Sequence, residues 1–168
     1  MMIFGTQRLE VEQLSIDNLN DFHRIYGDRE IMKKIPTSVF SLEESKAELL
    51  AIIEAYGIVK HRLRVWGVFL RHNNSMIGVC ASIGVSEQSR EIGYRIMKEY
   101  WRQGFAKELV DGLINYLRQD SSIEFLTAEV DKYNIASIRI LEKNMTFLKE
   151  SYDNETDRYQ YHYALNLK

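Results

Sequence analysis

The stretch EIGYRIMKEYWRQGFAKELVDGLINYL, residues 91–117, decides the fold of this chain. Its first part, residues 91–96, is typical of a short β-strand, and a glycine-containing turn follows. From Phe105 onward the apolar residues recur at every third or fourth position, as in an amphipathic helix. They are Phe105, Leu109, Val110, Leu113, Ile114 and Leu117. The sequence therefore predicts a strand, a tight turn at Gly104 and a helix ending near Leu117.

The turn into this helix can bind an anion. The first backbone N–H groups of a helix lack partners within it and lie at the positive end of its dipole. Gly104 and Ala106 leave these groups uncovered by side chains, and Arg102 and Lys107 can add positive charge. On the residues alone, phosphate binding and an ordinary tight connection both stay open.

The motif WRQGFA at residues 101–106, after EIGY at 91–94, resembles the acetyl-coenzyme A loop of the GNAT family of N-acetyltransferases. Within that family it resembles the branch that contains the ribosomal-protein N-terminal acetyltransferases. The family pattern is Gln/Arg-x-x-Gly-x-Gly/Ala, which Gly104 and Ala106 match, whereas Trp101 departs from it at the first position. The resemblance spans nearly the whole chain.

The resemblance implies an α/β (α+β) fold with a mixed, mostly antiparallel sheet of about seven strands flanked by helices. It also implies acetyl-coenzyme A as the co-substrate. The residues that would hold its pyrophosphate are Arg102, Gln103, Gly104, Phe105, Ala106 and Lys107. The backbone near Ile96 would pair with the pantetheine arm like an added strand. Asn134 would contact a pantetheine amide, and it can also cap the late helix.

Glu91 is the candidate general base, acting directly or through a water on the attacking amine. The alternative is a surface carboxylate paired with Arg90 or Arg139. Many family members place a tyrosine seven residues after the asparagine of the late helix as proton donor to the leaving thiolate. Here that position is Leu141, so Ser137 is the candidate donor.

The hydroxyl groups that could donate the proton each have an alternative, purely structural role. The Ser137 hydroxyl can instead bond to a backbone carbonyl of its own helix. Tyr94 is a second candidate donor, with a packed aromatic ring as its structural alternative.

Composition limits the function classes. The 168 residues suit a single domain over 1–168, and the net charge of −2 argues against a nucleic-acid surface. The single cysteine, Cys80, lies in an apolar run and is expected to be a buried strand thiol. The four histidines show no metal-ligand spacing, so no metal is expected. Without a signal peptide or membrane-spanning run, we expect no membrane partner and a cytoplasmic protein.

The remaining elements follow from local patterns. Predicted strands span residues 6–14, 63–70, 76–85, 91–96, 123–130, 145–149 and 159–167, with a hairpin turn at 71–75. Predicted helices start at Ser15 or Asp17, at Asp28, at Ser41 through a capping box with Glu44, and near Asn134. Asn144 is expected in the left-handed conformation that often ends a helix. Residues 36–40 are expected near the acceptor.

The sequence thus predicts acetyl transfer from acetyl-coenzyme A to a primary amine: a protein N-terminus, a polyamine or a small molecule. The alternative is a catalytically inactive module that binds acyl-coenzyme A for sensing or assembly, because Leu141 replaces the usual tyrosine. Whether the protein is a monomer or a homodimer is left open.

Overall fold

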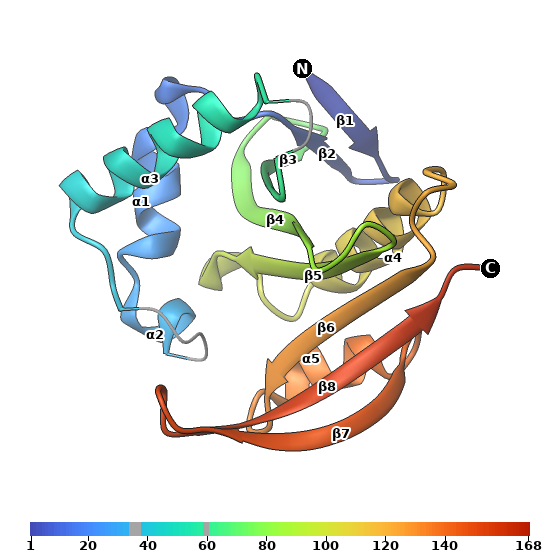
Figure 1. Ribbon diagram of the computed structural model, residues 1–168. Coiled ribbons are helices and arrows are strands. Elements are labelled where there is room, and N and C mark those ends of the chain that lie inside the picture. The colour runs from blue at the N-terminus through green and yellow to red at the C-terminus, as the bar shows by residue number, and fades with distance from the viewer. Residues whose placement is uncertain (34–37, 59–60) are drawn as a thin grey trace.

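The computed structural model describes residues 1–33, 38–58 and 61–168, and its centre is a mixed eight-stranded sheet (Figure 1). The strands are β1 Met2–Gly5, β2 Leu9–Glu12, β3 Leu63–Leu70, β4 Met76–Gly84, β5 Ser89–Ile96, β6 Phe125–Asp131, β7 Thr146–Asp153 and β8 Arg158–Asn166. They lie in the order β1-β2-β3-β4-β5-β6-β8-β7. Every neighbouring pair is antiparallel except β5 and β6, which are parallel.

The prediction of about seven strands was one strand short. The additional strand is β1, which pairs with β2 and carries Phe4 into the core against the ring of Tyr116. Within this four-residue strand only Phe4 is buried, so the sequence offered no alternation to recognise. The predicted strand over residues 6–14 is correspondingly shortened to β2.

Helices cover both faces of the sheet (Figure 1). They are α1 Leu19–Tyr26, α2 Arg29–Met32, α3 Leu42–Ala55, α4 Phe105–Leu117 and α5 Ile135–Leu141, with 3-10 turns at Ile16–Asn18 and Lys98–Tyr100. On one face, α1 and α3 pack over β3 and β4. On the other, α4 packs against β1 and β5 and α5 against β6. The described residues contain no helix long and apolar enough to cross a membrane.

Local predictions for two helices are confirmed. All six residues of the predicted apolar stripe of α4 are buried. At the start of α3, Ser41 Oγ accepts a hydrogen bond from the Glu44 N–H at 3.2 Å. The Ser41 N–H donates in return to Glu44 Oε2 at 2.7 Å, which completes the capping box.

The prediction for Cys80 is confirmed, whereas the prediction for Asn144 is wrong. Cys80 is fully buried in β4, and burial raises the pKa of its thiol, so the buried strand thiol is confirmed. Asn144 does not adopt the left-handed conformation. Its side chain instead donates to Asp111 Oδ1 of α4 at 2.8 Å, which ties the end of α5 to α4.

The feature that positions the site is the divergence of β5 from β6. The two strands pair only at three positions, ending at Glu91 opposite Thr127. Beyond that point β5 stays with β4 to Ile96, whereas β6 stays with β8 to Asp131. Figure 1 shows the two strands running apart, so the sheet opens into a V with Glu91 near its vertex.

Candidate functional site

A cavity of about 340 Å³ occupies this V between β5 and β6. Its lining includes Glu91, Gly93, Tyr94 and Arg95 from β5, Glu129 and Asp131 from β6, and Asn134, Ser137 and Leu141 from α5 and its cap. Three of the residues singled out in the sequence, Glu91, Asn134 and Ser137, therefore meet at one place. The part of the expected acceptor region at residues 36–37 lies outside the described residues.

The exposed edge of β5 presents backbone groups to this cavity. The Met97 N–H donates to the Ile77 carbonyl of β4 at 2.8 Å. Because peptide groups alternate in direction along a strand, those of Tyr94 and Ile96 point away from β4 and into the opening. The Trp101 indole donates to the Ile96 carbonyl at 2.6 Å, so of the two backbone groups of Ile96 the N–H is left to pair with a ligand.

The glycine turn after β5 is built by two residues with positive φ. Arg102 has φ of 61° and Gly104, the N-cap of α4, has φ of 83°. The first hydrogen bond of α4 runs from the Glu108 N–H to the Gly104 carbonyl at 3.1 Å. The N–H groups of Phe105, Ala106 and Lys107 precede that bond and are the unpaired donors of a helix N-terminus.

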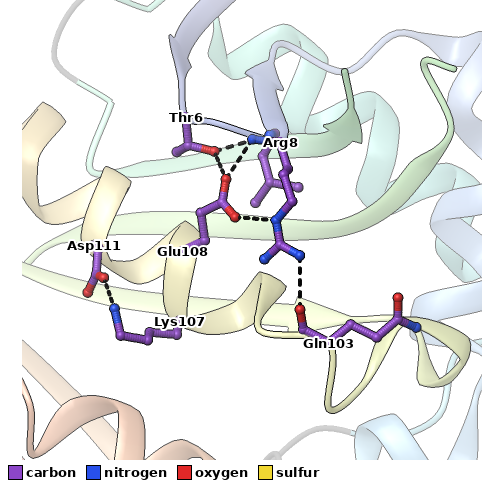
Figure 2. Close-up of polar contacts among 7 residues, drawn as sticks. Thr6, Arg8, Gln103, Lys107, Glu108 and Asp111 are labelled. Atoms are coloured by element: carbon purple, nitrogen blue, oxygen red, sulfur yellow. Dashed lines mark hydrogen bonds and ion pairs between the residues drawn. The ribbon is translucent and has the colours of Figure 1, made fainter. Parts of the chain in front are cut away.

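Arg8 braces this turn, a role that the sequence did not indicate. Figure 2 shows its guanidinium between Glu108 and Gln103. Its Nε donates to Glu108 Oε2 at 2.7 Å and its Nη1 donates to the Gln103 carbonyl at 3.0 Å. The guanidinium also lies 4.3 Å from the centroid of the Phe105 ring. The turn is therefore fixed to the start of β2 by a residue about a hundred positions earlier in the chain.

Lys107 and Gln103 have partners of their own within this region. The Lys107 ammonium pairs with Asp111 one turn further along α4, as Figure 2 shows. The Gln103 side chain donates to the Glu99 carbonyl at 2.7 Å, which links the glycine turn to the preceding 3-10 turn. The positive charge of Lys107 is thus partly offset by Asp111, whereas the backbone N–H groups at the start of α4 stay available to a ligand.

Glu91 is half-buried beside the cavity rather than exposed on the surface of the sheet. It forms no ion pair within the part of the chain that the structure describes, and Arg90 donates instead to backbone carbonyls of Ser86 and Ser89. Burial, and then repulsion from the carboxylate of Glu129, raises the pKa of Glu91. Both effects disfavour the charged form and move its titration toward neutrality.

Tyr94 and Ser137, separate candidates in the sequence, form one unit. The Tyr94 hydroxyl donates to Ser137 Oγ at 3.0 Å across the cavity. Burial raises the pKa of Tyr94, an effect that its bond to Ser137 partly offsets, so the phenol stays protonated. Leu141, at the position of the usual family tyrosine, is buried and offers no proton.

Asn134 is the N-cap of α5. Its Oδ1 accepts from the Ser137 N–H, with an N–O distance of 3.4 Å. The amide nitrogen of Asn134 has no acceptor among the described residues, and Asn134 is one of the residues that line the cavity. The capping role is confirmed, and the side chain keeps a donor for a ligand. In the part of the chain that the structure describes, no group of three or more His, Cys, Asp or Glu side chains is placed to hold a metal.

Comparisons with known proteins agree with this geometry. The chain matches the family described as acetyltransferase (GNAT) domain over residues 8–144. It is 29% identical over 154 residues to the uncharacterized N-acetyltransferase YoaA of Bacillus subtilis, covering 88% of this chain and 84% of the relative.

Two solved structures share the fold. One is RimL, a ribosomal L7/L12 alpha-N-protein acetyltransferase in complex with coenzyme A, with a TM-score of 0.83 and 17% identity over 99% of this chain and 98% of that one. The other is spermidine N-acetyltransferase from Vibrio cholerae in complex with coenzyme A and spermine, with a TM-score of 0.79 and 17% identity over 95% and 96% of the two chains. With the splayed sheet, the glycine turn and the family match over residues 8–144 together, the chain belongs to the GNAT family of acetyltransferases.

Proposed function

We propose that the protein transfers the acetyl group of acetyl-coenzyme A to a primary amine. In this reaction the amine attacks the thioester directly, without a covalent enzyme intermediate. The observation that carries the proposal is the meeting of an isolated, half-buried carboxylate and a hydroxyl pair in one cavity: Glu91 on one side and Tyr94 with Ser137 on the other.

The residues present fit acetyl-coenzyme A, which supplies the activated acetyl thioester. The N–H groups of Phe105, Ala106 and Lys107 would bind the pyrophosphate at the positive end of the α4 dipole. The Ile96 N–H on the open edge of β5 would pair with a pantetheine carbonyl as in strand addition. The free amide nitrogen of Asn134 would donate to the same arm.

Glu91 would accept the proton that the attacking amine loses. An α-amine titrates near 8 and a lysine amine near 10.4, so exposing the neutral form at pH 7 costs about 1.4 or about 4.6 kcal/mol. A carboxylate whose pKa is raised by burial is a stronger base than one in water, which reduces the unfavourable part of this transfer.

Tyr94 and Ser137 would supply a proton to the leaving thiolate. Ser137 Oγ accepts from the Tyr94 hydroxyl, so the serine proton is free to point toward the cavity. As the serine proton moves to the thiolate, the tyrosine proton can follow onto the serine oxygen. This pair replaces the family tyrosine that is absent at Leu141.

The acceptor class within the primary amines is part of the proposal. Protein N-termini, polyamines and small-molecule amines are all candidates. The solved relatives include one protein named for a ribosomal L7/L12 substrate and another bound to spermine, so both kinds of acceptor occur on this fold.

Thiol release from acetyl-coenzyme A with a panel of amines at pH 7 and 8.5 tests the proposal. We expect turnover with at least one amine class, and loss of most of it in Glu91→Gln, which keeps the side-chain shape. The proposal fails if acetyl-coenzyme A binds but no amine is ever acetylated. Unchanged turnover in Glu91→Gln would remove only the assignment of the base.

A further inference from the structure

The cavity has charges of opposite sign at its two ends. Near the vertex of the V, Glu129 lies close enough to Glu91 to raise the pKa of Glu91, and Glu129 Oε1 also lies 3.2 Å from His162 Nδ1. At the open end of the V lie two arginines, Arg95 on β5 and Arg158 on β8. The vertex therefore carries two carboxylates and one imidazole, whereas the open end, or mouth, carries two guanidinium groups and one carboxylate, that of Asp131.

The two arginines lie on opposite arms of the V, at a similar distance from the last pair that joins β5 to β6. Arg95 is four residues beyond Glu91, the last residue of β5 that pairs with β6. Asp131 is likewise four residues beyond Thr127, and Arg158 Nη1 lies 4.0 Å from its Oδ2. Both guanidinium groups lie on the sheet face that carries Glu91 and Glu129. Side chains two positions apart along a strand share a face, as do paired residues on neighbouring strands, and Asp131 pairs with Gln160, two positions after Arg158.

Each arginine has a buried donor without a hydrogen bond among the described residues. Arg95 Nε and Arg158 Nη1 are buried and have no hydrogen-bond partner among the described residues. The Arg95 guanidinium donates from Nη1 to the Tyr26 hydroxyl at 2.8 Å, which holds it in place without using Nε. Buried polar groups are nearly always hydrogen-bonded, so two cationic donors without a hydrogen bond beside one cavity, one of them with only Asp131 at 4.0 Å, favour an anionic ligand there.

Gly93 makes room for a ligand between the acidic and basic ends. It lies between Glu91 and Arg95 on the same face of β5, and a Cβ built on it would meet no atom within 4 Å. By the rise of a strand, the Cα atoms of Glu91 and Arg95 are about 13 Å apart. Both side chains are long, so the space left over Gly93 suits a short molecule with a charged group at each end.

We propose that the acceptor is a primary amine that also carries a carboxylate, either a free amino acid or a peptide N-terminus followed closely by an acidic residue. Its amine lies at Glu91 and Glu129, its chain crosses Gly93, and its carboxylate binds Arg95 and Arg158. This inference rests on the proposed acetyl transfer and narrows its acceptor. A polyamine fits less well, because its second ammonium would meet two arginines at the mouth.

Amines with the same four-carbon chain provide the first test. We would compare kcat/KM for 4-aminobutyrate, butylamine and 1,4-diaminobutane, whose fourth carbon from the reacting amine is a carboxylate, a methyl group and an aminomethyl group. The tripeptide amides Ser-Asp-Ala and Ser-Lys-Ala form a second matched set, and whichever set reacts better identifies the source of the acid. We expect the acidic member of each set to be preferred by roughly 10-fold or more, the usual effect of a charged contact.

Charge reversal separates recognition from folding. Arg158→Glu should lower kcat/KM for 4-aminobutyrate and raise it for 1,4-diaminobutane, a change of order that loss of stability would not produce. Arg95→Gln should reduce the preference for the acid without changing KM for acetyl-coenzyme A. Arg139→Gln is the control, because Arg139 is exposed on α5 outside the cavity lining, and it should leave the preference unchanged.

Gly93→Ala probes the floor of the cavity. Its methyl group meets no protein atom and Gly93 has no positive φ, so the variant should fold normally. We expect KM for the acceptor to rise several-fold, while KM for acetyl-coenzyme A stays unchanged.

The outcomes distinguish this inference from the proposed function. Acetylation of butylamine or diaminobutane at least as fast as aminobutyrate, with no change of order in Arg158→Glu, would overturn the inference and leave the acetyl transfer standing. If no amine is acetylated, the proposed function fails, and ligand-observed NMR of the same three amines then decides the inference. Preferential binding of aminobutyrate that is lost in Arg158→Glu would support it, and equal or absent binding would refute it.

Discussion

The Tyr94 hydroxyl donates a hydrogen bond to Ser137 Oγ at 3.0 Å, and this bond joins β5 to α5 across the opening of the sheet. The two residues are 43 positions apart in the chain. Their contact places a phenol and a serine hydroxyl in series beside the cavity that Glu91 also lines.

Removing either hydroxyl should slow the reaction without weakening co-substrate binding. We expect Tyr94→Phe and Ser137→Ala each to lower kcat by roughly 10- to 1,000-fold, because a positioned proton donor contributes about 100- to 10,000-fold and the remaining hydroxyl or a water substitutes in part. KM for acetyl-coenzyme A should change little. Tyr116→Phe is the matched control, since Tyr116 packs against Phe4 and Trp66 away from the cavity. Additive losses in the double variant would contradict a relay.

The pH dependence should report Glu91. Its pKa is raised by burial and by Glu129, and only the deprotonated carboxylate accepts a proton, so kcat/KM should rise with pH through this raised pKa. Glu129→Gln removes the repelling charge, so the rising limb should move to lower pH. Glu87→Gln, an exposed residue in the turn before β5, should leave the limb in place. A limb that stays fixed in Glu129→Gln would show that another group titrates.

The raised pKa of Glu91 also predicts that Glu91→Gln is more stable than the unsubstituted protein at neutral pH. A carboxyl group with a raised pKa in the folded state binds its proton more tightly when folded, so ionisation destabilises the protein above that pKa. Glu91→Gln should therefore raise the melting temperature at pH 7. The gain should shrink as pH falls and vanish below about pH 4, where the unfolded carboxyl is also protonated. Melting curves at several pH values check this, and a gain that persists at low pH would assign it to packing instead.

Arg8 should control the glycine turn. Arg8→Ala removes its bonds to Glu108 and to the Gln103 carbonyl and its stacking on Phe105. The side chain is 43% exposed, so we expect a loss of only about 1 kcal/mol in the free energy of unfolding. KM for acetyl-coenzyme A should rise several-fold, with kcat nearly unchanged. Arg71→Ala, on the neighbouring hairpin turn, is the control, and an equal rise in its KM would exclude a specific role for Arg8.

Gly104→Ala should strain the turn directly. The φ of 83° at Gly104 is unfavourable for a residue with a Cβ, and that Cβ would also lie 3.3 Å from Arg8 Nη2. We expect a loss of about 1–2 kcal/mol in stability and weaker binding of acetyl-coenzyme A. Gly84→Ala has no positive φ and meets its nearest atom at 3.5 Å, so it should be nearly neutral. Equal stability of the two variants, measured by denaturant unfolding, would contradict the argument.

Local patterns alone determined the strand–turn–helix at the centre of the chain. The apolar stripe of α4 and the capping box at Ser41 were readable because each depends on residues within a few positions of one another. The same holds for the glycine at the N-cap of α4. The candidate residues Glu91, Asn134 and Ser137 were also found from the sequence, through their likeness to a known family.

Tertiary structure alone decided how these pieces meet. The pairing of β1, the bracing of the turn by Arg8 and the bond from Tyr94 to Ser137 each join segments far apart in the chain. The placing of Arg95 opposite Arg158 likewise depends on how far β5 and β6 diverge after their last pair. A periodic pattern specifies which face of a strand is buried, but it does not specify which distant side chain that face will meet.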